Sequence, residues 1–226
     1  MLGRGRRRGA AAGGGMAALI GQLRADGYVK TPEVARALAG ADRAGFLPAE
    51  AAGDAYVDAP LSIGHEQTIS APHMVAIMVE ALEARPGMKV LEVGGGSGWH
   101  AAVIAGLVGR RGRVVSLERI AALAEAARAN LARAGFADRV RVVVADGSVG
   151  FPGEAPFDRI SVAAAAPRVP PPLVEQLSPA GGRLLVPVGS RTYQELVAVT
   201  RTGDARREQR LGGCVFVPLL GQEGFT

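Results

Sequence analysis

A short apolar strand that runs into a glycine-rich turn is the segment of this sequence best suited to bind a ligand. Glu92 lies near the end of the strand, Gly94, Gly96 and Gly98 follow, and a helical pattern begins at Trp99. Gly94 allows a sharp turn, Gly96 lets a ligand approach the main chain, and Gly98 permits close packing of the helix, whose N-terminus points at the ligand. This order predicts a site for a nucleotide-type ligand.

Three nucleotide-type ligands bind to turns of this kind, and the residues discriminate among them. A nucleoside triphosphate site needs Gly-Lys followed by Ser or Thr, whereas this turn reads Gly-Ser-Gly-Trp at 96–99. A dinucleotide site needs G-x-G-x-x-G, which Ala101 completes only in its relaxed form. The third ligand is S-adenosylmethionine, which carries a cationic sulfonium and amino group. The turn excludes the first ligand and leaves the other two open.

Acidic residues at three strand ends favour S-adenosylmethionine. Glu92 would attract a cationic amino-acid group and repel a pyrophosphate. Glu118 ends the next strand about 20 residues beyond the turn, where a carboxylate accepts hydrogen bonds from both ribose hydroxyls. Asp146-Gly147 ends the third strand, where an adenine amino group would lie. Taken singly, Glu118 or Asp146 is equally well explained by a helix cap or by solvation, but together the three acids mark one edge of a sheet.

The pattern after Pro86-Gly87 predicts the sheet that would hold these residues. Short apolar strands alternate with helices, which is typical of a parallel sheet covered on both faces. Strands are expected at 89–93, 113–117, 140–145, 159–162 and 183–188, and helices at 99–108, 120–133 and 171–177. Apolar runs at 195–200 and 209–219, joined by the polar segment 201–208, predict an antiparallel hairpin at the edge. We expect an α/β fold with a doubly wound, mostly parallel sheet and an antiparallel C-terminal edge.

Helical patterns precede this sheet. Their signals are an apolar periodicity from Met16, a Thr-Pro-Glu start at 31–33 and a Ser-Ala-Pro start at 70–72. Ser70 is the expected N-cap of the third helix. We therefore expect one domain over 16–226, which divides into an N-terminal helical region on the substrate side and a donor-binding α/β core, at 16–86 and 87–226.

Composition bounds the class of protein. The 226 residues are 48% hydrophobic and 21% charged, as in folded globular proteins. Cys214 is the only cysteine, which fits a reducing compartment and leaves no multi-cysteine zinc site. No stretch reaches the ~20 apolar residues of a membrane span, and no signal-peptide pattern follows the N-terminal arginines. We expect a cytoplasmic protein that does not associate with membranes.

The net charge of +5 is concentrated at the N-terminus. Arg4, Arg6, Arg7 and Arg8 account for four of the 26 basic residues, and the remaining 22 face 21 acidic residues. Residues 1–15 combine Gly, Ala and Arg without apolar periodicity, which predicts a disordered tail. Any contact with nucleic acid is therefore expected to be weak and confined to this tail.

The block Ile-Gly-His-Glu-Gln-Thr-Ile-Ser-Ala-Pro at 63–72, together with the glycine turn, resembles the protein-L-isoaspartate O-methyltransferase family. Members carry a similar Ile-Gly-x-x-x-Thr-Ile-Ser-x-Pro block just ahead of the donor-binding strand. The similarity extends from about Met16 to Leu220. Further matches are Asp-Gly at 146–147, the alanine run that ends at Pro167, 177–184, Pro-Val-Gly at 187–189 and Phe-Val-Pro-Leu at 216–219.

The resemblance implies a Rossmann-like enzyme that transfers the methyl group of S-adenosylmethionine to the free carboxylate of isoaspartyl residues in damaged proteins and peptides. The ester closes to a succinimide that can reopen as aspartate, S-adenosylhomocysteine is the second product, and no metal takes part. Ser70 matches the active-site serine, and substrate contacts are expected from Thr68, Ile69, Ser70, Val217 and Pro218. Donor contacts are expected from Gln67, Thr68, Glu92, Gly94, Gly96, Ser97, Gly98, Glu118, Asp146 and Gly147.

The residues themselves agree with this chemistry. A carboxylate with a pKa near ~4 is ionised at neutral pH, so its methylation needs no general base. An N-cap serine would place its hydroxyl and the free helix N–H groups at the positive end of a helix dipole, where an anion binds. We expect catalysis by positioning of the carboxylate in line with the methyl group. His65, His73 and His100 are expected on solvated loop or helix faces, without a catalytic role.

Two positions depart from the family pattern. Gly95 stands where relatives often carry Ser or Thr, and Trp99-His100 replaces a Tyr-Gln pair. Trp99 would pack over the donor or, more simply, in the core.

Three other functions stay open: methylation of aspartate in a dedicated modified peptide, whose enzymes usually carry an added C-terminal region that a chain ending at Thr226 lacks; a nucleic-acid-associated role of the arginine-rich tail; and an NAD-type oxidoreductase. Nothing in the sequence requires more than a monomer.

Overall fold

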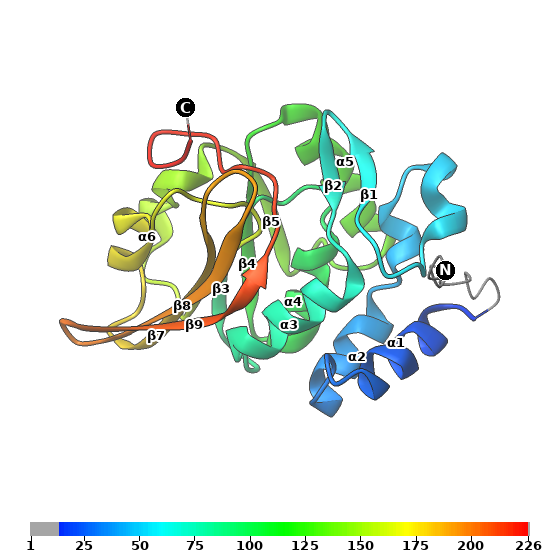
Figure 1. Cartoon of the computed structure of the whole chain (residues 1–226), viewed down its shortest axis with the longest axis horizontal. Coiled ribbons are helices and arrows are strands. Elements are labelled where there is room, and N and C mark those ends of the chain that lie inside the picture. Colours follow the sequence, from blue (N-terminus) through cyan, green and yellow to red (C-terminus); the bar gives the residue numbers. More distant parts are fainter. Residues whose placement is uncertain (1–13, 226) are drawn as a thin grey trace, which may run out of the picture.

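A computed structural model describes residues 14–225, and this part of the chain has the α/β architecture that the sequence predicts. Helices flank a central sheet, with α1 (Met16–Ala25) and α2 (Pro32–Gly40) at one end of the molecule and the C-terminal hairpin projecting at the other (Figure 1). No helix of residues 14–225 is long and apolar enough to cross a bilayer. Of the tail predicted at 1–15, residues 1–13 lie outside the described part.

Seven strands form the central sheet: β3 (Lys89–Val93), β4 (Arg113–Glu118), β5 (Val140–Val144), β6 (Arg159–Val162), β7 (Ala180–Gly189), β8 (Gln194–Thr202) and β9 (Ala205–Cys214). Their spatial order is β5-β4-β3-β6-β7-β8-β9, with parallel pairing from β5 to β7 and antiparallel pairing beyond it. The strand order reverses between β3 and β6. In doubly wound sheets, ligands bind outside the carboxyl ends of the strands at this switch point.

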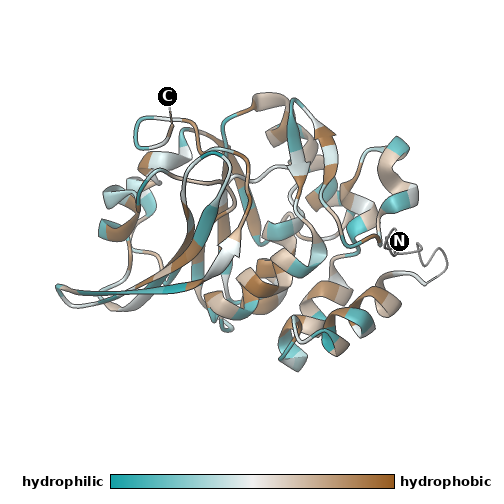
Figure 2. Ribbon diagram, viewed as in Figure 1, coloured by the Kyte–Doolittle hydropathy of each residue, from teal (hydrophilic) through white to brown (hydrophobic). Residues whose placement is uncertain are grey.

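The C-terminal hairpin differs from the prediction in length. The polar segment 201–208 was expected to be a connection, but β8 and β9 continue through it and turn only at Gly203-Asp204. Polar residues form strands here because the hairpin projects from the body of the molecule, so that its distal part meets water; Ala205–Arg210 are all exposed. Figure 2 shows the same contrast between the hydrophilic tip and the apolar interior strands. β9 is therefore an uncovered edge of the sheet.

The remaining helices are α3 (Pro72–Leu82), α4 (Trp99–Val108), α5 (Ala121–Arg133) and the short α6 (Pro171–Glu175). The predicted start of α2 is correct, since Thr31 Oγ1 accepts a hydrogen bond from Val34 N at 3.3 Å. The patterns do not predict the small hairpin of β1 (Leu61–Gly64) and β2 (Gln67–Ile69). Its strands are too short for the alternation of apolar residues to be recognised.

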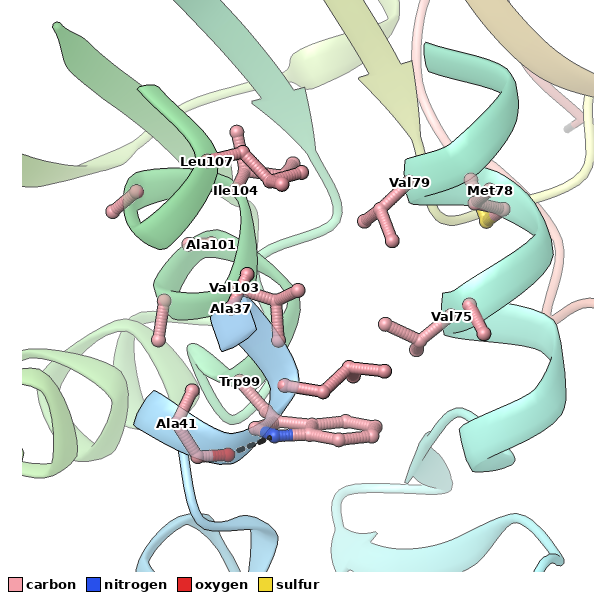
Figure 3. Packing of buried hydrophobic residues seen from close by; sticks show 14 of the residues in the cluster. Ala37, Ala41, Val75, Met78, Val79, Trp99, Ala101, Val103, Ile104 and Leu107 are labelled. Carbon is pink, nitrogen blue, oxygen red and sulfur yellow. Dashed lines mark hydrogen bonds between the residues drawn. The ribbon is translucent and has the colours of Figure 1, made fainter. Parts of the chain in front are cut away.

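Two apolar clusters cover the two faces of the sheet. The larger joins α1 to α5 to one face, and the smaller packs α6 and neighbouring loops against the other. Trp99 lies in the larger cluster with only 1% of its surface exposed, and its Nε1 donates to the Ala41 carbonyl at 2.8 Å (Figure 3). Trp99 therefore packs in the core, where it joins α4 to the end of α2.

A buried arginine ties the N-terminal region to the segment before α3. The Arg43 guanidinium donates to the carbonyls of Ala55, Val57, Ala59 and Ser70 at 2.8–3.1 Å, and it lies 5.3 Å from the centre of the Trp99 ring. Burial lowers the pKa of Arg43 to about 10, so the side chain is still charged at neutral pH. One cation thus holds main-chain groups from four positions in fixed relation.

Replacement of Arg43 by Lys should lower the free energy of unfolding by roughly 2–4 kcal/mol. A single ammonium group cannot reach four carbonyls that a planar guanidinium spans, so buried acceptors lose their donors. Urea unfolding followed by far-UV circular dichroism measures the change. Arg36→Lys is the matched control, because Arg36 makes an exposed ion pair with Glu33 and should change stability by less than about 0.5 kcal/mol. Equal stability of the two variants would contradict the role of Arg43.

Candidate active site

A pocket lies at the carboxyl ends of β3, β4, β5 and β6, at the switch point of the sheet. The glycine turn, the end of β4 and the loop after β6 form its floor, while the β1–β2 hairpin and the C-terminal segment 217–220 form its sides. These segments are far apart in the sequence. Its lining residues are Gln67, Thr68, Val93, Gly94, Gly96, Glu118, Arg119, Ile120, Gly147, Ala163, Ala164, Val217, Pro218, Leu219 and Leu220.

Glu118 connects the glycine turn to α5. Its Oε2 accepts from Gly96 N at 2.9 Å and its Oε1 accepts from Ile120 N at 2.8 Å, so the carboxylate supports both the turn and the residue just before α5. Because Ile120 is itself the N-cap residue, this bond does not satisfy a free helix N–H group, and α5 has no side-chain cap. Each carboxylate oxygen keeps acceptor capacity, and Glu118 lines the pocket. The side chain is fixed in place before any ligand arrives.

Glu92 lies beneath the turn and not in the pocket. Its side chain is fully buried, Oε2 accepts from Ser116 Oγ at 2.5 Å, and Oε1 lies 3.6 Å from His100 Nδ1. Burial raises the pKa of Glu92 to about 8 and lowers the pKa of His100 to about 4, so at neutral pH both groups are uncharged. The expected position of His100 on a solvated face is wrong, because the ring packs against the strand that carries Glu92.

The same cluster explains the glycine at position 95. A Cβ on residue 95 would lie 2.5 Å from Ser116 Oγ, the hydroxyl that donates to Glu92. A serine or threonine there would have to displace that hydroxyl. Gly98 is constrained in another way, because it has a φ of +86° and its added Cβ would lie 3.2 Å from Leu131 of α5. Both glycines shape the turn through close packing behind it.

Asp146 anchors the C-terminal segment. Its Oδ1 accepts from Ser148 N and its Oδ2 accepts from Gln222 N, both at 2.9 Å. Partial burial would raise the pKa of Asp146, but hydrogen bonds from Gln222 and Ser148 together outweigh burial and lower it. Asp146 does not line the pocket, whereas its neighbour Gly147 does, and a Cβ on Gly147 would lie 2.4 Å from a methyl carbon of Val93. The carboxylate thus holds the segment that closes one side of the pocket.

The structure separates the predicted donor contacts into two groups. Six of them line the pocket: Gln67, Thr68, Gly94, Gly96, Glu118 and Gly147. The other four lie behind it: Glu92, Ser97, Gly98 and Asp146. Sequence reasoning missed the apolar lining by Ile120, Leu219 and Leu220. The only signal for these residues is that each lies within two residues of Glu118 or Pro218.

A groove of about 740 Å³ adjoins the pocket. Thr68, Ala163 and Val217 line both of them. Ser70 lines the groove, and its hydroxyl makes no hydrogen bond within residues 14–225. Of the predicted substrate contacts, Thr68, Ser70 and Val217 are in the groove and Pro218 is in the pocket. Ile69 points into the core, with 4% of its surface exposed.

Ser70 is not the N-cap of α3, as the sequence predicted. The helix begins at Pro72 with Ala71 as its N-cap, and the cap is supplied from a distance: Asp58 Oδ1 accepts from His73 N and lies 2.9 Å from His73 Nδ1. Pro72 has no N–H to donate. The Ser70 hydroxyl therefore makes no hydrogen bond to α3, Ser70 lines the groove, and its carbonyl accepts from Arg43 at 3.1 Å.

His73 also lines the groove, with its ring fixed by Asp58 and packed 5.3 Å from the Tyr28 ring centre. Its side chain is 34% exposed at the start of α3, which agrees with the expected position on a helix face. Within residues 14–225, no group of three or more His, Cys, Asp or Glu side chains is placed to hold a metal ion.

Replacement of Glu92 by Gln should flatten the dependence of stability on pH between 6.5 and 8. In this range the unfolded Glu92 carboxyl is ionised while the native one keeps its proton, so the free energy of unfolding falls by up to roughly 1.4 kcal/mol per pH unit and levels off above pH 8. Below about pH 6.5 the opposite contribution of His100, protonated only when unfolded, offsets the fall.

Urea unfolding at pH 6.5, 7.25 and 8 measures this slope. Glu125→Gln is the control, since Glu125 is exposed and paired with Arg128 on α5. Identical slopes for the wild-type chain and Glu92→Gln would show that Glu92 is ionised in the native protein.

Comparison with known proteins places this site in a family. The family model described as Protein-L-isoaspartate(D-aspartate) O-methyltransferase (PCMT) matches residues 15–224. The protein-L-isoaspartate O-methyltransferase of Methanopyrus kandleri is 54% identical over 208 residues, 92% of either chain. That of Hyperthermus butylicus is 51% identical over 215 residues, 92% of this chain and 89% of the relative.

A solved structure agrees with these relatives. A protein-L-isoaspartate O-methyltransferase from Plasmodium falciparum, crystallised with S-adenosyl-L-homocysteine, has a TM-score of 0.83 at 26% identity and covers 92% of this chain and 99% of its own. The resemblance seen in the sequence is confirmed over nearly all the described residues. The chain belongs to the protein-L-isoaspartate(D-aspartate) O-methyltransferase family.

Proposed function

We propose that this enzyme transfers the methyl group of S-adenosylmethionine to the free carboxylate of isoaspartyl residues in damaged proteins and peptides. The observation that carries the proposal is that the pocket and the groove share Thr68, Ala163 and Val217, so that a donor and an acceptor meet at one wall. Relatives of the same family that are about half identical over the chain support it. The resulting ester would close to a succinimide and so begin repair.

The pocket fits the donor. Gly94 and Gly96 bring bare main chain to its floor, and the Glu118 carboxylate is positioned to accept hydrogen bonds from ribose hydroxyls. Ile120 and Leu220 offer apolar contacts to a purine ring. When bound, the donor supplies an electrophilic methyl group. Glu118 holds the sugar while the turn approaches the amino-acid portion.

The residues behind the pocket act indirectly in this proposal. Glu92 supports the turn through Ser116, and Ser97 Oγ accepts from Trp99 N at 3.4 Å at the start of α4. Asp146 fixes the C-terminal segment through Gln222. These side chains hold the donor site in shape without touching the donor.

The groove fits an anionic acceptor at Ser70. The Ser70 hydroxyl makes no hydrogen bond within residues 14–225, so it can donate to one carboxylate oxygen while the other oxygen faces the pocket. The carboxylate is ionised at neutral pH, so no proton has to be removed and no general base is needed. Ser70, Thr68 and Val217 would therefore act by orienting the carboxylate and excluding water.

We also propose partners and an organisation for the chain. Isoaspartyl-containing proteins and peptides would be the partners, the enzyme would work as a cytoplasmic monomer, and contact with nucleic acid would be limited to the N-terminal tail. Residues 16–86 would supply Ser70 and the β1–β2 hairpin to the substrate side, and residues 87–226 would form the donor-binding core and also line the groove through Ala163 and Val217.

Methyl transfer should be confined to isoaspartyl peptides. Two peptides that differ only in isoaspartyl or normal aspartyl at one position are incubated with radiolabelled S-adenosylmethionine, and ester formation is counted. The isoaspartyl peptide should be labelled and the aspartyl peptide should not. Donor binding without transfer to either peptide would indicate a dedicated acceptor, and absence of donor binding would refute methyl transfer altogether.

Replacement of Ser70 by Ala should lower kcat/KM for an isoaspartyl peptide roughly 10- to 100-fold. The variant loses a hydrogen bond to a charged group, and a bond of this kind contributes about 1.5–3 kcal/mol. Steady-state kinetics and donor titration together measure the effect, and donor affinity should be unchanged because Ser70 lies outside the pocket. Ser178→Ala, which removes a hydroxyl just before β7 and outside both the pocket and the groove, is the control. Wild-type turnover in Ser70→Ala would remove Ser70 from the active site.

A further inference from the structure

Two exposed apolar side chains stand at the groove. Tyr193 is 61% exposed and Val215 is 72% exposed, and both line the groove beside Ser70. Within residues 14–225, the other large hydrophobic side chains that are comparably exposed are Val57 and Val144, which line neither the groove nor the pocket. The two most exposed large apolar residues of the described chain therefore both line the groove beside Ser70.

Tyr193 and Val215 adjoin the last paired residues of the C-terminal hairpin. Gln194 of β8 pairs with Cys214 of β9, so Tyr193 and Val215 directly flank this pair. The Tyr193 ring lies over Gly213, where an added Cβ would be 3.2 Å from its hydroxyl oxygen. Glycine at 213 leaves room for the ring, and Tyr193 and Val215, which both line the groove, are called the apolar wall below.

A buried glutamine fixes both halves of this wall. Gln194 is fully buried; its Nε2 donates to Ser190 O at 2.6 Å, within the turn that carries Tyr193, and its Oε1 accepts from Phe216 N at 2.8 Å, next to Val215. Tyr193 N also donates to Ser190 Oγ at 3.1 Å. Hydrogen bonds therefore fix the main chain of the wall, although burial does not stabilise the exposed Tyr193 and Val215 side chains in the free protein.

We propose that Tyr193 and Val215 set substrate preference by binding an apolar side chain that neighbours the isoaspartyl residue. The inference rests on the proposed function and extends it to the flanking sequence. A substrate that presents its carboxylate at Ser70 continues along the groove, which also takes in Pro60, Met74 and Phe216 and is far larger than one side chain. Because these surfaces are apolar, an aliphatic or aromatic neighbour gains from contact and a charged one loses its hydration.

The preference would suit damaged chains. Apolar side chains are buried in intact folded proteins and become accessible when a segment unfolds. Because the wall would bind an apolar neighbour more tightly, the enzyme would favour isoaspartyl sites in unfolded segments over sites on folded surfaces. Burial of ~55 Å² of apolar surface corresponds to about tenfold in kcat/KM.

The test uses four isoaspartyl peptides, with Leu or Ser placed directly before or directly after the isoaspartyl residue. The wild-type enzyme should show kcat/KM about tenfold higher for Leu than for Ser at one of the two positions, mainly through KM. In the double variant Tyr193→Ser with Val215→Ser this ratio should fall to about one. Tyr193→Phe should keep the ratio, since the ring and not the hydroxyl makes the contact. Val144→Ser, a matched change at an exposed valine outside both the groove and the pocket, should also keep it.

The outcomes separate the two proposals. A wild-type enzyme that methylates all four peptides with equal kcat/KM, or a double variant that keeps the wild-type ratio, refutes the apolar wall and leaves the proposed function standing. A wild-type enzyme that binds donor but methylates none refutes the proposed function. Donor affinity checks folding of each variant, because neither residue lines the donor pocket. If light scattering shows a wild-type dimer that the double variant lacks, the wall is instead an interface between copies of the chain.

Discussion

The arrangement of the active site depends on one buried cation that is bound by main-chain carbonyls. Arg43 makes no salt bridge within residues 14–225; four carbonyl dipoles and the Trp99 ring replace its hydration, and the charge of the Asp58 carboxylate also favours the charged guanidinium. One of those carbonyls belongs to Ser70. The loop from Ala55 to Ala59, the core tryptophan and the segment that carries the serine are thereby fixed against one another, so the acceptor side of the site is built on the N-terminal region.

A different set of interactions holds the donor side in place. There the parallel sheet brings the ends of β3, β4 and β6 to one edge, and Glu118 joins the turn to α5 by accepting two main-chain N–H groups. The two sides meet at Thr68, Ala163 and Val217. Since transfer to an ionised carboxylate requires alignment and no movement of protons, a rigid meeting point of two independently held ligands is sufficient for the proposed reaction.

Local signals in the sequence predicted the sheet, most helix starts and the pocket-lining glycines, because strands, caps and turns depend on nearby residues. Contacts between distant residues were not predictable in this way. The cap of α3 comes from Asp58 rather than Ser70, and the groove brings Tyr193 and Val215 together with Ser70. His100 was expected on a solvated face although α4 is apolar on nearly all sides, a pattern that indicates a buried helix. The presence of glycine at position 95, where relatives often carry Ser or Thr, could be explained only from the structure, in which Ser116 lies against it.

The uncovered strand β9 has a consequence for an enzyme of this kind. Its outer edge leaves main-chain groups unpaired, and such edges readily add strands from other chains. Arg206, Arg207 and Arg210 crowd this edge together with Glu208, and Arg210 also pairs with Glu195 on β8. Charged side chains of this kind discourage pairing between edges. The charged edge would therefore oppose incorporation of this enzyme into aggregates of the damaged proteins that it is proposed to methylate.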